Sequence, residues 1–248
     1  MNISTKIKPI FIFLLLNYIT VAYSFAQDPV SIKTQITAKS IIDKYIETTG
    51  GADSFAKIED RTIYFSGSSM GQNISLIIMQ KAPDKLFREI VVGEVHQKKY
   101  FDGKNGVLIL GNNKIEIDET ELESLQIDAA LDFLLNSQKY NVEVKYDGKE
   151  MCDSSECYKL KMILPSGNIW FQYFDATTGF RIKETKEIQT PTGNYNQTTC
   201  YNNYREIEGL KFPFEIRQIL GAQKTVLNID SLKINSGLPD SLFKIPDL

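Results

Sequence analysis

Apolar and polar residues alternate along most of the chain after residue 60, and this period of two constrains the fold more than any other feature. The alternation is clearest over 140–146 and 158–164. Turns rich in Gly and Asn, such as 102–106 and 111–113, separate the alternating segments, and these residues tolerate positive φ. The pattern predicts roughly a dozen short strands in an antiparallel meander. Since each strand has one apolar face, a sheet of this length is expected to curl and to be covered.

Two segments depart from this period and are predicted to be helices. The first is 37–49, with Thr37 as its N-cap and Gly50-Gly51 as its stop. The second, 119–136, interrupts the strands with apolar residues near helical spacing and without Gly or Pro. We therefore predict a mainly β domain with an N-terminal helix and an inserted helix, the two elements able to cover the apolar face.

The first 26 residues have the features of a secretory signal. Lys6 and Lys8 precede an apolar run at 10–16, and Ser24-Phe25-Ala26 provides small residues at a cleavage site. A retained membrane anchor is the alternative, but the run is shorter than the ~20 residues that span a bilayer. We expect 1–26 to be removed near Ala26, 27–36 to be a mobile leader and 37–248 to form one exported domain.

Export makes a disulfide possible between Cys152 and Cys157, which flank a polar four-residue loop between two predicted strands. The same spacing would suit a metal pair, but Cys200 alone cannot complete a tetrahedral site. We therefore predict the disulfide and no metal site.

Catalytic motifs are missing from the sequence. The one histidine, His96, lies among polar residues, and there is no GxSxG motif and no Gly-rich phosphate loop. The balance of 28 Lys and Arg against 31 Asp and Glu also disfavours a nucleic-acid partner. We expect no enzyme and no cofactor; a hydrolase with paired carboxylates is a third reading without a specific motif.

Several short motifs occur in a recognisable order. They are Lys81-Ala82-Pro83-Asp84 at the start of a strand, Phe101-Asp102-Gly103-Lys104, Asp175-Ala176-Thr177-Thr178-Gly179, the segment 203–213 and the tail 242–246. Along most of residues 37–246 the chain resembles the lipoprotein carriers of the LolA type, in the LolA/LolB-like superfamily. The carriers have an arginine immediately before the proline that opens the strand, and here that position is Ala82.

The resemblance implies a half-open antiparallel β-barrel, with an inserted lid helix over an apolar cavity. In the carriers this cavity takes the acyl chains of lipoproteins that cross the periplasm to the outer membrane. We therefore expect a periplasmic binding or carrier protein for lipoproteins or another acylated or apolar ligand, and not an integral membrane protein. The expected lining of cavity and lid is Ile63, Phe65, Leu76, Ile78, Leu125, Phe133, Leu134, Leu160, Met162 and Phe171, with Trp170 on the face opposite Phe171.

The alternative is a non-catalytic interaction module. In that case the protein's own side chains would fill the barrel, and an exposed apolar patch or strand edge would bind a protein partner at the cell envelope.

Overall fold

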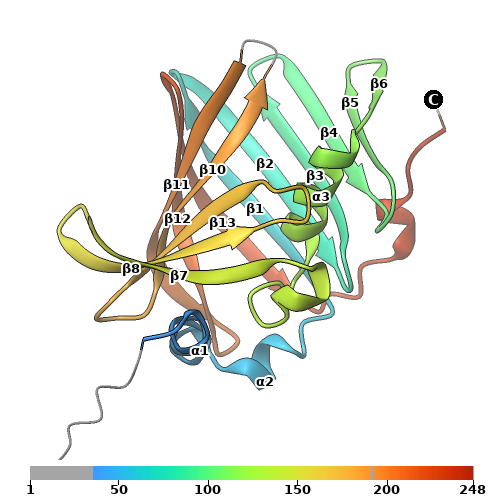
Figure 1. Ribbon diagram of the computed structural model, residues 1–248. Helices are drawn as coiled ribbons and strands as arrows, with labels where there is room; N and C mark the ends of the chain where they lie inside the picture. Colours follow the sequence, from blue (N-terminus) through green and yellow to red (C-terminus); the bar gives the residue numbers. More distant parts are fainter. Residues whose placement is uncertain (1–35, 191–192, 248) are drawn as a thin grey trace, which may run out of the picture. The chain divides into compact units, whose positions relative to one another are not determined.

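The computed structural model describes residues 36–190 and 193–247, so the predicted signal segment and nearly all of the predicted leader lie outside the described residues. The described part contains one antiparallel 13-stranded sheet with the order β6-β5-β4-β3-β2-β1-β13-β12-β11-β10-β9-β8-β7 (Figure 1). Its strands are β1 (Asp60–Ser69), β2 (Gln72–Lys81), β3 (Lys85–Val92), β4 (Val95–Phe101), β5 (Gly106–Leu110), β6 (Asn113–Glu116), β7 (Glu143–Cys152), β8 (Ser155–Ile163), β9 (Ile169–Asp175), β10 (Arg181–Thr190), β11 (Gly193–Ile207), β12 (Leu210–Leu220) and β13 (Gln223–Ile234). The edges β6 and β7 do not pair with each other, so the sheet stays open, as predicted.

The topology explains why the inserted helix lies over the sheet. Two meanders, β1–β6 and β7–β13, join where β1 pairs with β13, for example at Ile63 opposite Leu232. The segment between β6 and β7 therefore connects the two opposite edges of the sheet. The helix in this segment, α3 (Glu119–Ala129), packs against β3 and β4 on the concave side of the sheet (Figure 1).

The first helix, α1 (Ala38–Thr49), confirms the helix predicted over 37–49. The Thr37 side chain accepts a hydrogen bond from the Ser40 amide, and the Ser40 side chain accepts one from the Thr37 amide. Gly50 ends the helix at φ 130°, and a Cβ atom there would lie 2.5 Å from the Gly209 carbonyl oxygen. The helix packs against β7 and β12, and α2 (Ala52–Phe55) follows it.

The inserted helix is shorter than the predicted 119–136. Asp118 caps the N-terminus of α3, and the helix ends at Ala130, whose backbone is extended. In the turn that follows, the Asp132 carboxylate accepts hydrogen bonds from the Tyr140 hydroxyl at 2.7 Å and the Asn136 side chain at 3.0 Å. These local bonds favour a turn followed by the 3-10 helix η1 (Ser137–Tyr140) over a continuing α-helix.

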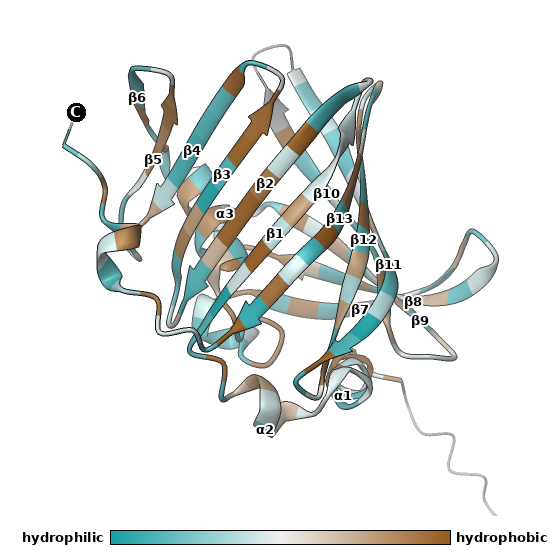
Figure 2. Cartoon of the chain, turned by 180° about the vertical axis from the view of Figure 1, so that it is seen from behind, coloured by the Kyte–Doolittle hydropathy of each residue, from teal (hydrophilic) through white to brown (hydrophobic). Residues whose placement is uncertain are grey.

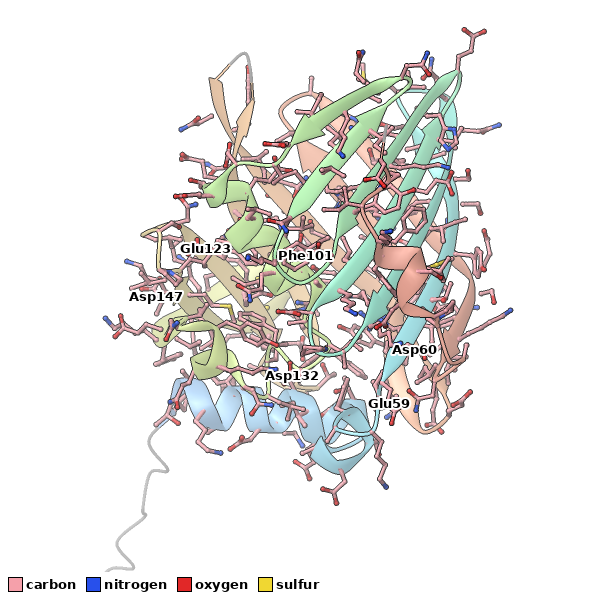
Figure 3. The ribbon with its side chains drawn as sticks, turned by 90° about the vertical axis from the view of Figure 1, so that its right-hand side faces the viewer. Glu59, Asp60, Phe101, Glu123, Asp132 and Asp147 are labelled. Atoms are coloured by element: carbon pink, nitrogen blue, oxygen red, sulfur yellow. The ribbon has the colours of Figure 1, made fainter. Side chains whose placement is uncertain are left out.

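The core is divided among several clusters on the concave face. One cluster lies on β1, β2 and β13, which we call the bare sheet, and includes Phe65 and Leu76. Another lies under α1 and includes Leu160 and Phe174. A third lies under η1 and a fourth under α3, where Phe101 is 2% exposed (Figure 3). Seen from behind, β1 to β4 show hydrophobic and hydrophilic bands in alternation along each strand (Figure 2). A second 3-10 helix, η2 (Asp240–Phe243), contacts β3, and its Phe243 is buried.

None of the helices in the described ranges has the length and apolar character needed to traverse a bilayer.

Candidate functional site

A cavity of about 380 Å³ lies on the concave face of the sheet, and we name it the inner cavity. Strands β1 to β3 and β12 and β13 contribute one wall, while β10 and β11 contribute the other. Tyr45 of α1, Phe55 of α2 and Asp128 of α3 complete the lining. The inner cavity therefore lies between the sheet and the two helices that the sequence predicts as covers.

The first wall of the inner cavity is mainly apolar, although Arg61, Gln80 and Arg88 also belong to it. Ile63 on β1 is opposite Ile78 on β2, so both side chains share the concave face. Ile78 and Ile216 are only half-buried, although they pack against the buried cluster that contains Phe65. The wall thus presents apolar surface that the described residues do not fully cover.

The second wall is polar. Register pairs Glu184 on β10 with Gln172 on β9 and Thr199 on β11, and all three side chains are buried. The Gln172 side-chain amide donates a hydrogen bond to the Glu184 carboxylate. Lys186 lies 3.6 Å from Asp128 and 3.7 Å from Glu184, and these carboxylates outweigh the desolvation of Lys186 and raise its pKa. The polar wall is therefore held by buried hydrogen bonds and ion pairs.

Two arginines, Arg61 and Arg181, line the inner cavity. Arg61 donates from Nε and Nη2 to the Gln80 side-chain oxygen, at 3.0 and 2.5 Å, and lies over the Phe212 ring. Burial lowers the pKa of Arg61 to about 10, and repulsion by Arg181 adds to this lowering. At neutral pH both guanidinium groups still carry their charge.

Arg181 is held differently. Its guanidinium lies 4.1 Å from the centre of the Tyr201 ring, 3.9 Å from Glu184 and 3.4 Å from the Gln172 side-chain oxygen. Its Nε is buried and has no hydrogen-bond partner in the described structure. This N–H is therefore able to donate a hydrogen bond to a ligand in the cavity.

Gln80 connects this site to the inserted helix. Its side-chain amide donates to the Asp128 carbonyl of α3 at 2.7 Å while its oxygen accepts from Arg61. Ala82, at the position of the carriers' arginine, is exposed, and its backbone amide donates to Glu59. In this protein Gln80, two residues before Ala82, connects β2 to α3 through its hydrogen bond to Asp128.

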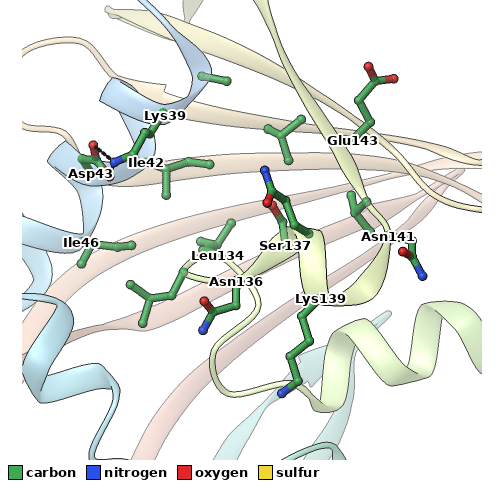
Figure 4. A pocket seen from close by; sticks show the side chains of 15 residues that line it. Lys39, Ile42, Asp43, Ile46, Leu134, Asn136, Ser137, Lys139, Asn141 and Glu143 are labelled. Atoms are coloured by element: carbon green, nitrogen blue, oxygen red, sulfur yellow. Dashed lines mark hydrogen bonds and ion pairs between the residues drawn. The ribbon is translucent and has the colours of Figure 1, made fainter.

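Two further hollows adjoin the inner cavity. A side cavity of about 220 Å³ shares Tyr45, Arg61 and Arg181 with it and extends to Phe133 and Trp170. An outer groove of about 1130 Å³ runs between α1 and residues 134–144 (Figure 4). The outer groove and the side cavity have Ile46, Leu134 and Leu135 in common. The three hollows thus form a row from the outer groove to the inner cavity.

The structure brings half of the residues predicted to line the cavity to these hollows. Ile63, Phe65 and Ile78 line the inner cavity, and Phe133 and Leu134 line the side cavity. The other predicted residues on the concave face are packed in core clusters: Leu76 on the bare sheet, Leu125 under α3, Leu160 under α1 and Met162 under η1.

Phe171 does not reach the concave face. Register places Trp170 and Gln172 inward, opposite Lys186 and Glu184, so the expected orientation of Trp170 and Phe171 is reversed. Phe171 packs on the outer face against the cluster of Cys152, Cys157 and Tyr173. Lys159 lies over its ring at 4.2 Å, and this cover lets an aromatic side chain remain on the outer face.

Cys152 and Cys157 are both buried in this outer cluster and are free thiols in the structure. Cys157 is opposite Glu150 and Cys152 is opposite Ser155, so the two cysteines are diagonal neighbours across the β7–β8 hairpin. Burial and the neighbouring Cys152 raise the pKa of Cys157 to about 12. The disulfide remains a prediction.

The charged side chains that line the inner cavity, among them Arg61, Arg181 and Glu184, were not predicted from the sequence. β10 is polar on both faces, so its alternation does not show which side chains point inward. Gln172 could have indicated a polar patch inside the sheet, because it interrupts the aromatic run Trp170–Phe174. The described residues contain no group of three or more His, Cys, Asp or Glu side chains placed to hold a metal ion.

Comparison with known sequence families finds no match, and comparison with curated proteins finds none either. Solved structures do match. A LolA superfamily protein from Nitrosomonas europaea is 15% identical with a TM-score of 0.57, over 85% of this chain and 99% of that chain. A DUF1329 family protein from Desulfovibrio piger is 14% identical with a TM-score of 0.55, over 85% and 98%. A domain named for outer membrane lipoprotein sorting, from Vibrio parahaemolyticus, is 13% identical with a TM-score of 0.53, over 83% and 97%.

These matches cover nearly the whole of each solved chain and show that this protein has a LolA-like fold. At these identities the similarity shows the fold alone.

Proposed function

We propose that this protein is an extracytoplasmic binding or carrier protein that holds lipoprotein acyl chains, or another acylated or apolar ligand, in the concave side of its half-open sheet. The observation that carries the proposal is the apolar wall of the inner cavity. Ile78 and Ile216 on this wall are half-buried beside a cavity of about 380 Å³. Such surface is unfavourable in water and gains free energy when an apolar ligand covers it.

The size of the gain is adequate for a carrier. Burying about ten methylene groups at ~0.8 kcal/mol each gives on the order of 8 kcal/mol before the ordering costs of binding. Part of that sum is lost as translational and conformational entropy, which leaves a ligand that is held and can also be released.

A ligand released from the inner cavity needs a path to solvent. The row of three hollows, from the inner cavity to the outer groove, supports such a path. The outer groove is bounded on one side by α1 and on the other by residues 134–144, which run from the connection between β6 and β7 into the start of β7 (Figure 4). Because this connection has few strand hydrogen bonds, it is the part of the cover expected to move.

The proposed location follows from the sequence. We expect residues 1–26, which have the features of a secretory signal with cleavage near Ala26, to direct the mature domain to the periplasm. We infer no catalytic role, because the polar wall is committed to buried hydrogen bonds and ion pairs and the described residues that line the cavity show no paired nucleophile and base.

The first test is native mass spectrometry of the mature protein purified from the periplasm of its own host. A bound species of lipid or lipoprotein mass that denaturation releases is the expected result. A protein that is empty and also fails to take up an apolar fluorophore would contradict the proposal and favour the interaction module.

A matched pair of variants on β12 locates the binding wall. Ile216 faces the inner cavity, whereas Ile219 is 39% exposed on the outer face of the same strand. We expect Ile216→Gln to weaken binding of the fluorophore by roughly tenfold, the equivalent of about 1.4 kcal/mol of lost apolar contact. Ile219→Gln should leave the affinity unchanged. Equal losses in both variants would place the fluorophore elsewhere.

A further inference from the structure

The balance of charge in the inner cavity is uneven. Five cationic side chains line it, namely Arg61, Arg88, Arg181, Lys186 and Lys211, against the two carboxylates Asp128 and Glu184. The ion pairs use both carboxylates: Asp128 pairs with Lys186, and Glu184 with Lys186 and Arg181.

Arg61 and Arg88 therefore have no carboxylate within ion-pair distance in the described part of the chain. Arg61 contacts only neutral groups, the Gln80 side-chain oxygen and the Phe212 ring. A partly buried charge without a counter-charge costs stability, so a cluster of this kind persists where function requires it.

The donors of this cluster are held in place. Gln80 is anchored by the Asp128 carbonyl and in turn orients the Arg61 guanidinium. Arg181 is stacked on Tyr201 and keeps its Nε without a partner. Guanidinium groups bind carboxylates and phosphates through paired N–H donors, which match the geometry of an anionic head group.

We infer, on the basis of the proposed function, that the ligand is a single-chain anionic amphiphile, with its head group at Arg61 and Arg181 and its alkyl chain along the apolar wall. Cationic and apolar side chains line the same cavity, which supports both halves of this ligand. The volume of about 380 Å³ is near the lower end of small-molecule pockets, roughly 300–1,000 Å³, and suits one chain. Fatty carboxylates and alkyl phosphates share the head-group chemistry.

The only tryptophan of the chain provides an internal reporter. Trp170 lines the side cavity, next to Arg61 and Arg181, and Lys186 lies 4.4 Å from the centre of its ring. Its fluorescence should follow titrations of the full mature protein with dodecanoate, dodecyl phosphate and dodecan-1-ol, each kept below its aggregation concentration.

We expect at least one of the two anions to bind tenfold or more tightly than dodecan-1-ol. Tighter binding of dodecanoate would identify a carboxylate head group, and tighter binding of dodecyl phosphate a phosphate. If dodecan-1-ol binds as tightly as both anions, the proposed function stands and the inference fails. If none of the three ligands binds and an apolar fluorophore does not bind either, both fail.

Variants test the named residue. Arg61→Gln should weaken binding of the preferred anion by about tenfold and leave dodecan-1-ol within twofold, while Arg61→Lys, which keeps the charge, should lose less. Arg217→Gln is the matched control, because Arg217 is exposed on the outer face of β12 and pairs with Glu215. An equal loss of anion and alcohol binding in Arg61→Gln would show a structural role and overturn the assignment. The wild-type comparison stands even if this variant does not fold.

Discussion

The two walls of the inner cavity belong to one continuous sheet and differ in chemistry. The β1–β2 side carries Ile63, Phe65 and Leu76 on its concave face, within one apolar cluster. The β9–β11 side carries Gln172, Glu184 and Thr199, all buried. Both sides are parts of one antiparallel sheet, so the difference in chemistry comes from the side chains.

This difference explains how a half-open sheet can keep a cavity. Two apolar walls would gain free energy by closing on each other and filling the space. Packing a polar wall against an apolar one would cost the polar groups their remaining hydration. The pairing of Glu184 with Gln172 and Lys186 stabilises that wall but does not fill the space in front of it.

The largest expected effect comes from breaking the apolar wall. Leu76 is 7% exposed and packed in the cluster on the bare sheet. Leu76→Ala should lower the free energy of unfolding by about 3 kcal/mol, because it removes buried contacts and leaves a void. Urea denaturation measures the loss. Leu110→Ala is the control, since Leu110 is 40% exposed, and should cost under about 0.5 kcal/mol. Similar losses in the two variants would mean that this wall is not closely packed.

A smaller effect is expected on the polar wall. Glu184→Gln removes the carboxylate shared by Lys186 and Arg181 and leaves those cations without it. We expect a loss of roughly 2–3 kcal/mol, below the full value for a buried pair because Asp128 still compensates Lys186. Chemical denaturation of Glu184→Gln and Glu187→Gln compares the two carboxylates, since Glu187 is exposed on the same strand. An unchanged free energy of unfolding in Glu184→Gln would show that this carboxylate contributes no stability.

The smallest effect concerns the outer face behind the polar wall. If Cys152 and Cys157 form the predicted disulfide after export, the non-reduced protein should be lighter by the mass of two hydrogens. So short a loop should stabilise the fold by only about 2 kcal/mol. Intact mass before and after reduction tests this, and the comparison of Cys200→Ser with the double variant Cys152→Ser/Cys157→Ser assigns the bond. An unchanged mass on reduction of periplasmic protein would exclude the disulfide.

The stabilities of the two walls therefore rest on different interactions. Direct apolar packing on the concave face stabilises the β1–β2 side. On the β9–β11 side, hydrogen bonds and ion pairs act inside, and an apolar cluster of Tyr173 and the two cysteines acts outside. Measurements on both faces of the sheet would show how far each side contributes to keeping the cavity open.

The amino-acid sequence by itself determined most of the strands and the approximate positions of the two helices. Alternation of period two and Gly-rich turns are local signals, so the meanders over β1–β6 and β7–β13 could be predicted before the structure. The capping box of Thr37 and Ser40 is local too, and it defines the start of α1 within one residue.

Only the tertiary structure decided which side chains meet. The end of α3 depends on contacts of Asp132 with Tyr140, and the inward orientation of Trp170 depends on register with β10. The cluster of Arg61 and Arg181 joins residues 120 positions apart, from β1 and β10, that no periodicity connects. Alternation reports where apolar faces lie, and a strand that is polar on both faces, such as β10, acquires its inner and outer sides only from its neighbours in the sheet.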